Sequence, residues 1–145
     1  MWDMAVMAPR MRAVLRIVAA LIFLEHGTQK LFGFPAPPAA GLPPAFSLYG
    51  IGAVLEFGGG LLLMLGLFTR PVAFVLAGEM AFAYWMFHAP RSVYPVLNGG
   101  DAAILYCFVF LYLVAAGPGA WAIDIRLGRE PEPHPASPRD AAVVR

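Results

Sequence analysis

The chain has 145 residues, of which 60% are hydrophobic and only 13% are charged, and this balance excludes an ordinary soluble domain. The formal net charge is +1 and the basic residues are scattered, so there is no reason to expect a nucleic-acid partner. The single cysteine, Cys107, excludes an intramolecular disulfide and a Cys-x-x-Cys redox pair. The composition indicates a protein that resides in a membrane.

Four apolar segments follow one another along the chain, from about residue 13 to 34, 46 to 68, 72 to 88 and 99 to 116. Each approaches the roughly 20 residues that a helix needs to cross about 30 Å of hydrocarbon. Each is also longer than the roughly ten residues of a membrane β-strand. The sequence therefore predicts an all-α protein, an integral membrane four-helix bundle with antiparallel, up-and-down topology, formed by residues 1–127.

Proline and glycine separate the four segments. A proline-rich stretch at 35–44 follows the first, the turn Thr69-Arg70-Pro71 follows the second, and residues 89–95 follow the third. Proline cannot continue a helix because it lacks the amide donor. The motif Gly117-Pro118-Gly119 ends the fourth segment. Residues 128–145 are polar and rich in proline, which predicts a disordered cytoplasmic tail.

The arginines predict the orientation, because cytoplasmic loops retain positive charge. Eight of them fall on one side of the predicted bundle, namely Arg10, Arg12, Arg16, Arg70, Arg126, Arg129, Arg139 and Arg145. Only Arg91 falls on the other side. We therefore expect both termini in the cytoplasm, and the proline-rich stretch and Arg91 outside.

Polar side chains inside the apolar segments form the candidate binding site. An unpaired ionised side chain at the bilayer centre costs at least about 2–3 kcal/mol, so such residues face the bundle interior. The candidates are Glu25, His26, Gln29, Lys30, Glu56 and Glu79, and the secondary candidates are His88, Asn98 and Asp101. Counting helix rise predicts one layer with Glu25, His26, Glu56 and Glu79, and a second layer with Lys30, His88 and Asp101.

Glycines around Glu56 favour close packing with a neighbouring helix. Gly52 and Gly60 stand four residues before and after Glu56, so the three share one helix face. Glu56 is therefore expected to point toward a neighbour. The run Gly58-Gly59-Gly60 predicts either close packing or a local kink.

Structural interpretations stand beside the functional ones. The charges at 25–30 could form an internal pair that fixes helix register. Asn98-Gly99-Gly100-Asp101 is typical of an N-cap followed by an acid, and Cys107 of a small packing residue. The aromatic run Phe82, Tyr84, Trp85 and Phe87 predicts an interfacial belt, although a ring-shaped ligand would also stack there. A metal site from Glu25, His26, Glu56 and Glu79 is the weaker alternative, because no Glu-x-x-His pair is present; nucleotide motifs are absent as well.

The sequence resembles the DoxX family of small bacterial four-helix membrane proteins, from about residue 12 to 125. The most distinctive piece is His26-Gly27-x-Gln29-Lys30-Leu31-Phe32-Gly33 within 16–33. Further pieces are Glu56-x-Gly58-Gly59, Leu65-Gly66-Leu67-x-Thr69-Arg70, Asn98-Gly99-Gly100-Asp101, and Gly117-Pro118-Gly119 leading to Asp124. Asp101 stands where the family often has Glu, and Ala122-Ile123 where Ser-Leu is common.

The resemblance implies a multi-pass protein of a bacterial inner membrane with links to quinone-related redox work. Members of the similar DoxD group are linked to thiosulfate oxidation, and other members to complexes with oxidative-stress enzymes. The first hypothesis is a quinone-associated component of a redox complex, in which Lys30 and His26 donate to the ring oxygens and Glu25, Glu56 and Glu79 pass protons. A membrane or peripheral partner protein would then carry the electrons.

Two further hypotheses come from other classes of function. One is a scaffold or assembly factor without catalysis of its own, favoured by the glycine stripe and by the lack of a complete catalytic set. The other is permeation of a small solute or proton through a homo-oligomer, favoured by four ionisable groups near mid-span. The sequence does not decide whether the protein is an enzyme.

Overall fold

The computed structural model describes residues 3–131, and every regular element within them is helical. The four long segments are α1 (Met4–Phe32), α2 (Leu48–Leu65), α3 (Thr69–Ala83), which continues into the π-helix η1 (Tyr84–His88), and α5 (Asp101–Ala116). Two short helices, α4 (Pro95–Asn98) and α6 (Ile123–Arg126), flank α5. The predicted all-α class is confirmed for this part of the chain. Most of the predicted tail, residues 132–145, lies outside the described residues.

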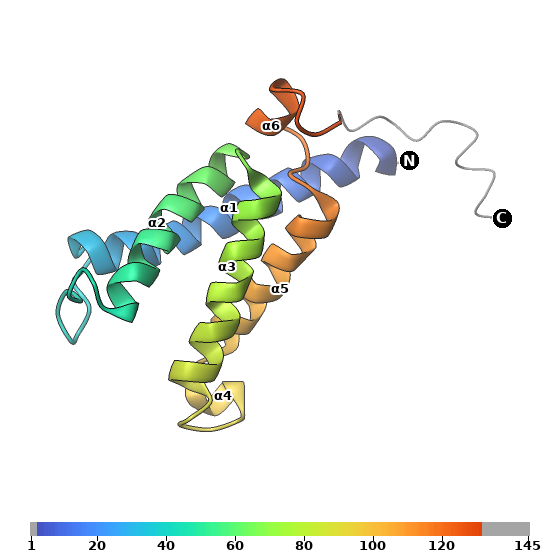
Figure 1. Ribbon diagram of the computed structural model, residues 1–145. Helices are drawn as coiled ribbons and strands as arrows, with labels where there is room; N and C mark the ends of the chain where they lie inside the picture. The colour runs from blue at the N-terminus through green and yellow to red at the C-terminus, as the bar shows by residue number, and fades with distance from the viewer. Residues whose placement is uncertain (1–2, 132–145) are drawn as a thin grey trace.

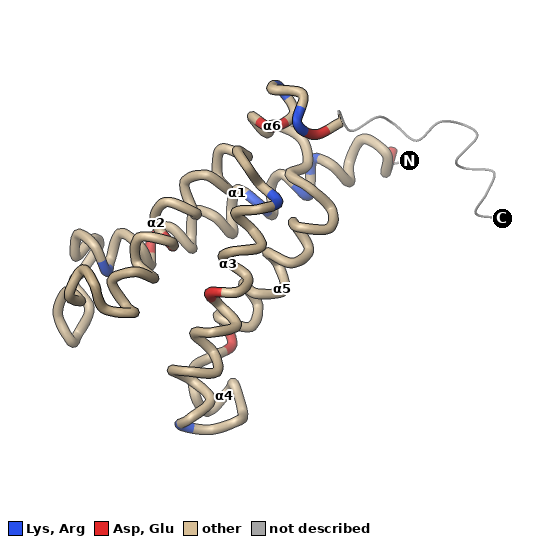
Figure 2. The backbone as a smooth tube through the Cα atoms, viewed as in Figure 1, with Lys and Arg blue, Asp and Glu red and all other residues tan. Residues whose placement is uncertain are grey.

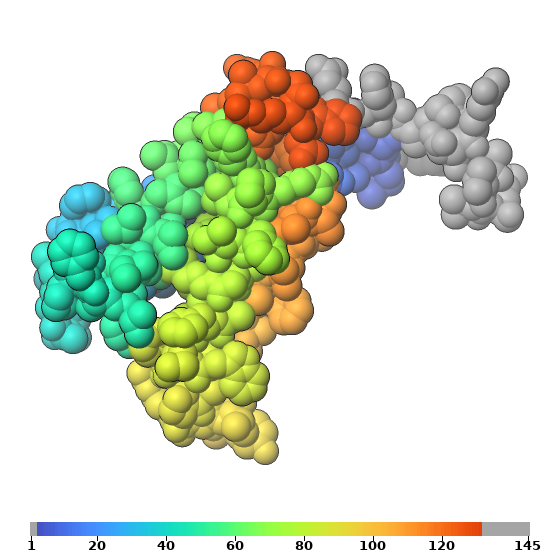
Figure 3. All heavy atoms as spheres, viewed as in Figure 1, coloured from blue at the N-terminus to red at the C-terminus, as the bar shows by residue number. Residues whose placement is uncertain are grey.

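The long helices are arranged as two pairs (Figure 1). α1 packs along α2, α3 packs along α5, and contact between the pairs runs mainly through α2 and α3. The pairs meet at the end of the molecule that carries α6 and diverge toward the proline-rich loop and α4. The space-filling view shows a hollow between the diverging ends (Figure 3).

Local chemistry explains where the first two helices begin and end. The side chain of Asp3 accepts from Ala5 N at 3.0 Å, and that of Ser47 accepts from Gly50 N at 3.0 Å, so both helices carry a side-chain N-cap. Gly33 and Gly66 end them in the left-handed conformation, which glycine adopts without strain. α1 begins well before the predicted residue 13, because hydropathy marks the apolar segment and not the cap that precedes it.

The predicted third and fourth segments are present with altered ends. The third divides into α3 and five residues of π-helix, a local widening that is common at functional sites. The fourth begins at Asp101, with Gly100 as its N-cap residue. Asn98 is therefore not the N-cap that the sequence predicted; it is the last residue of α4. Gly117 ends α5 as expected.

Among the described residues, α2 alone is a helix of membrane-spanning length and composition, with a mean hydropathy of 1.7 over 18 residues. α5 is apolar but shorter, with 16 residues. α1 is long enough to span a membrane, with 29 residues. Charged side chains within its apolar part keep it from matching the membrane-spanning composition of α2.

Glycine sets the close approach of α1 and α2. A Cβ on Gly27 would lie 2.5 Å from the backbone nitrogen of Phe57, and one on Gly60 would lie 3.2 Å from the Cα of Leu24. α2 runs without interruption through its three consecutive glycines. Of the two interpretations of that run, close packing therefore describes the structure, and a kink does not.

A buried arginine fastens the C-terminal segment to the end where the pairs meet. Arg16 is fully buried, and its guanidinium donates to the carbonyls of Leu63 at 2.5 Å, Met64 at 2.7 Å and Pro118 at 2.9 Å. It also donates to Ala120 and Trp121, both at 3.3 Å. We call Arg16 and these five carbonyls the arginine clasp. Sequence reasoning treated Arg16 only as a flanking charge and missed this role.

Further charged groups complete the same end of the molecule. Asp124 is buried and accepts from Phe68 N at 2.9 Å and Thr69 N at 2.8 Å, which caps α3. Arg12 donates to the carbonyl of Ala116, and Arg70 donates to Val114 and Ala115 at 2.5 and 2.9 Å. The last carbonyls of α5 thus receive arginine donors, which suits the negative end of a helix. Figure 2 shows basic positions gathered there.

Candidate functional site

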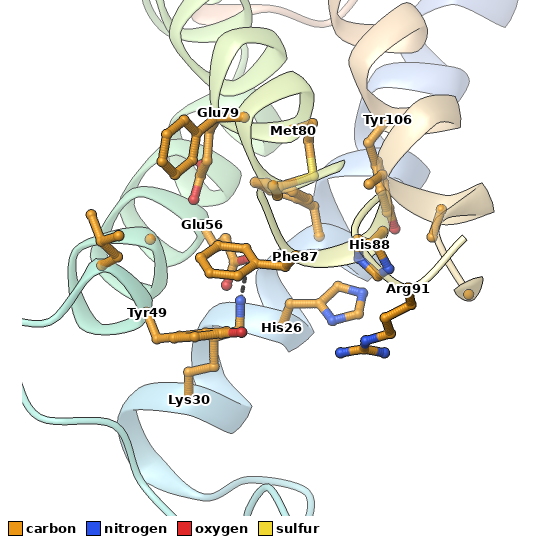
Figure 4. A pocket seen from close by; sticks show the side chains of 18 residues that line it. His26, Lys30, Tyr49, Glu56, Glu79, Met80, Phe87, His88, Arg91 and Tyr106 are labelled. Atoms are coloured by element: carbon orange, nitrogen blue, oxygen red, sulfur yellow. Dashed lines mark hydrogen bonds and ion pairs between the residues drawn. The ribbon is translucent and has the colours of Figure 1, made fainter. Parts of the chain in front are cut away.

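A cavity of about 380 Å³ lies between the two helix pairs. Aromatic side chains form much of its wall, and polar side chains from five parts of the chain enter it (Figure 4). The aromatic residues are Phe23, Tyr49, Phe82, Phe87 and Tyr106, and the polar residues are His26, Lys30, Glu56, Glu79, His88 and Arg91. Five of the nine predicted site residues therefore share one cavity.

Lys30 and Glu56 form an ion pair at the inner side of this cavity. Lys30 Nζ lies 2.6 Å from Glu56 Oε1, and the two side chains are 26% and 5% exposed. The pair joins α1 to α2 one turn beyond the Gly27 contact, so close helix packing brings the charges together. Glu56 does point toward a neighbour, as the glycine pattern predicted. The predicted division into two layers, with Lys30 and Glu56 apart, is wrong, because crossing helices do not share one axis along which rise can be counted.

Glu79 approaches the same place from the other helix pair. Its Oε1 lies 3.1 Å from the position of a Cβ on Gly52, one turn before Glu56. The absence of a side chain at Gly52 gives this carboxyl group its room. Glu56 Oε2 and Glu79 Oε2 are both buried and have no hydrogen-bond partner among residues 3–131.

Nitrogen-bearing side chains lie toward the opening of the cavity. His26, His88 and Arg91 lie near one another in Figure 4. His88 Nδ1 is 3.1 Å from the carbonyl oxygen of Asn98, so one ring nitrogen has a backbone partner. Within the described part of the chain, His26 and the Arg91 side chain have no hydrogen-bond or ion-pair partner.

Rings connect the two helix pairs across the cavity. Tyr49 of α2 and Phe87 of η1 have ring centroids 4.5 Å apart. On the opposite wall, Phe23 of α1 lies 5.1 Å from Tyr106 of α5. The aromatic run that predicted an interfacial belt is divided: Phe82 and Phe87 line the cavity, whereas Trp85 is 67% exposed.

Comparison with known proteins decides the family. The model of the DoxX family matches residues 11–89, more than half of the chain. The chain belongs to the DoxX family. An uncharacterized Haemophilus influenzae protein is 42% identical over 80% of this chain and 90% of its own length. The Escherichia coli inner membrane proteins YqjF and YphA are 30% and 29% identical over 81% and 86% of this chain, and over 92% and 96% of their own lengths. No solved structure matches.

This DoxX protein is therefore a membrane protein, and the matched region carries most of the cavity's polar residues. It includes His26, Lys30, Glu56 and Glu79, together with Arg16 of the clasp. The remaining wall, from Arg91 to Tyr106, follows the matched region. The resemblance drawn from short motifs is confirmed at the level of the family.

Four predicted site residues lie away from the cavity. Glu25 is exposed and Gln29 is half-buried, and neither lines it. Asn98 is buried with its side chain in a loop network, donating to Ser92 O at 2.7 Å and accepting from Gly100 N at 2.6 Å. Asp101 is exposed in the first turn of α5.

The metal alternative finds no support in the arrangement of the side chains. Within residues 3–131, no three His, Cys, Asp or Glu side chains come together as a ligand set. Glu25, exposed on α1, is separated from the group that the hypothesis required. Cys107 is half-buried and packs against the apolar core, as predicted.

Proposed function

We propose that this DoxX protein crosses a bacterial inner membrane four times, with α1, α2, α3 continued by η1, and α5 as its spans and with both termini in the cytoplasm. Two relatives bear the name inner membrane protein. Large apolar side chains cover the outward faces of these helices, such as Val18, Ile22, Val54, Phe74, Val75, Leu105 and Phe108. The basic residues near the arginine clasp match the cytoplasmic side of the positive-inside rule.

Within that bundle we propose that the cavity binds a quinone-type ring, as part of a membrane redox complex. The observation that carries this proposal is the combination of aromatic walls and convergent polar side chains in one cavity of about 380 Å³. Sites for small molecules have volumes of about 300–1,000 Å³, with mostly apolar linings and a few placed polar groups. Aromatic rings favour a planar ligand by offset or edge-to-face packing.

The polar groups have distinct roles in this proposal. His26 and Arg91 donate hydrogen bonds to ring oxygens near the opening, and Glu56 and Glu79 contact the ring at the inner side. Lys30 Nζ already bonds Glu56 Oε1, so its role is to hold that carboxylate in place and not primarily to donate to the ring. A ring that exchanges electrons does so with a membrane or peripheral partner protein.

Mass spectrometry of the protein purified in mild detergent tests this proposal. We expect a quinone-type molecule in the wild-type protein and its loss from Ala102→Trp, which fills the cavity from α5. Leu105→Trp is the matched control, because Leu105 lies on the same helix, is 66% exposed and does not line the cavity. Retention of the ring by the Ala102→Trp protein, or an empty folded wild-type protein, would contradict the proposal.

A scaffold function is the second candidate, and the Lys30–Glu56 pair favours it. The ion pair joins α1 to α2 beside the Gly27 contact, and an ion pair in this position can fix how the two helices are aligned. Under this alternative, Lys30→Met and Glu56→Gln alter stability, and Ala102→Trp leaves capture of the protein's membrane partners unchanged.

A further inference from the structure

The inner side of the cavity presents an unused hydrogen-bond acceptor. Glu56 Oε1 receives Lys30 Nζ at 2.6 Å, whereas Oε2 of the same group has no partner within residues 3–131. Glu56 as a whole is 4% exposed, so bulk water does not reach this oxygen freely. Leaving a buried polar atom without a partner is unfavourable, and more so for a charged group. A carboxylate paired with an ammonium group accepts hydrogen bonds and donates none.

Glu79 adds a second acceptor on the facing helix. Its Oε2 is likewise buried without a partner among the described residues, and its Oε1 lies over Gly52, one turn from Glu56. A carboxyl group accepts through both oxygens when ionised, and when protonated it carries one O–H donor and keeps acceptor capacity. Two carboxyl groups from different helix pairs thus present acceptor oxygens to a ligand that carries hydrogen-bond donors.

The opening of the cavity has the opposite character. His26 and Arg91 line it at exposed positions, without hydrogen-bond partners in the described part of the chain, and both carry N–H groups. Arginine has five donors and no acceptor. This side therefore offers N–H donors to a ligand oxygen. The aromatic pair Tyr49–Phe87, with centroids 4.5 Å apart, lies in the wall beside both regions (Figure 4).

We infer that this cavity binds the reduced, dihydroxy-aromatic form of a quinone-type ring in preference to its oxidised form. A phenolic hydroxyl donates one hydrogen bond and also accepts, so one hydroxyl donates its proton to Glu56 or Glu79 while the other accepts from Arg91 or His26. A quinone carbonyl accepts only, and it would leave Oε2 of Glu56, the carboxylate paired with Lys30, without a donor. This inference rests on the proposed function, since it names the redox form that the same cavity selects.

Binding of three rings to the full chain in detergent tests the inference. The probes are decylubiquinol under anaerobic conditions, decylubiquinone, and the dimethyl ether of decylubiquinol, which keeps the tail but lacks the hydroxyl donors. We expect the quinol to bind about tenfold more tightly than either of the others, the factor that corresponds to about 1.4 kcal/mol. In Glu79→Gln, whose amide retains one acceptor oxygen and adds N–H donors, we expect the preference to fall to about threefold or less. Glu25→Gln is the matched control, because Glu25 is exposed and does not line the cavity.

The outcomes separate the inference from the proposed function. A quinol preference that shrinks in Glu79→Gln and persists in Glu25→Gln supports the inference. Equal binding of all three rings, or tighter binding of the quinone, overturns the inference and leaves the ring site standing. Failure of every ring to bind the folded protein overturns both. If Glu79→Gln does not fold, the comparison of quinol with its dimethyl ether in the wild-type protein decides.

Discussion

Lys30 Nζ lies 2.6 Å from Glu56 Oε1, and this contact joins α1 to α2 at the inner side of an aromatic-walled cavity. The pair neutralises the most buried carboxylate of the cavity and leaves its second oxygen without a partner among residues 3–131. A single contact therefore links helix packing, through the glycine approach of α1 to α2, with the chemistry that the cavity offers to a ligand.

Removing one partner of this pair should cost more than removing both. Lys30→Met leaves Glu56 buried without its cation, and we expect a loss of about 2–3 kcal/mol in stability, below the range for fully buried pairs because Lys30 is partly exposed. The double change Lys30→Met with Glu56→Met should recover most of this loss. Thermal unfolding in detergent measures both. A double variant no more stable than Lys30→Met would contradict this account of the pair.

The arginine clasp predicts a strong and specific effect at Arg16. Arg16→Met leaves five backbone carbonyls without their guanidinium donors, and we expect a loss of at least about 3 kcal/mol. Arg16→Lys should recover only part, because an ammonium group lacks the planar fork. Limited proteolysis should release the segment after Gly117 from the variants. Arg10→Met, at an exposed position of the same helix, is the control and should behave as wild type.

Two glycines of the helix pair should respond oppositely to alanine. Gly27→Ala places a Cβ 2.5 Å from the backbone nitrogen of Phe57, so α1 must move away from α2, at a cost of about 1–3 kcal/mol. A Cβ on Gly58 meets no atom of residues 3–131 within 4 Å, and Gly58→Ala should stabilise α2 by up to about 1 kcal/mol. Thermal unfolding of both variants checks the prediction. Equal effects would show that the close approach is not a constraint.

The proposed topology predicts which loops react from outside the cell. In a Cys107→Ser background, Ala40→Cys in the proline-rich loop should react with a membrane-impermeant maleimide on intact spheroplasts. Gly128→Cys, after α6, should react only after the membrane is opened. Labelling of both positions, or of Gly128→Cys alone, in sealed spheroplasts would overturn the orientation assigned from the arginines.

Helix order and helix breaks could be predicted from the sequence because they depend on local chemistry. Proline, glycine and long apolar segments act within a few residues, so the predicted ends at 34, 68 and 116 lie within three residues of the observed ends at Phe32, Leu65 and Ala116. The π-helix is not predicted, because it lies inside the third apolar segment, where hydropathy does not distinguish it from an α-helix. The four-residue α4 is not predicted either, because it lies between two apolar segments and is too short to show a periodic pattern.

Only part of the candidate site could be predicted, because the sequence does not show which face of each helix points inward. In an apolar helix both the lipid-facing and the interior faces are hydrophobic, so the sequence does not separate Glu25, which is exposed, from Lys30, which lines the cavity. The role of Arg16 was also hidden, because its partners are backbone carbonyls 47 to 105 residues away. The available signal is that Arg16 lies inside an apolar segment. The positive-inside rule uses the same arginine to predict orientation, so the signal does not identify a buried role.

Photoaffinity labelling with an azidoquinone, followed by peptide mass spectrometry, tests the central claim that the cavity binds a ring. We predict label on peptides of the cavity wall, around Tyr49, Phe87 and Tyr106, that is lost in Ala102→Trp and kept in Leu105→Trp. Label confined to outward faces such as Val54 and Val75, or unchanged by Ala102→Trp, would contradict a ring-binding function for this cavity.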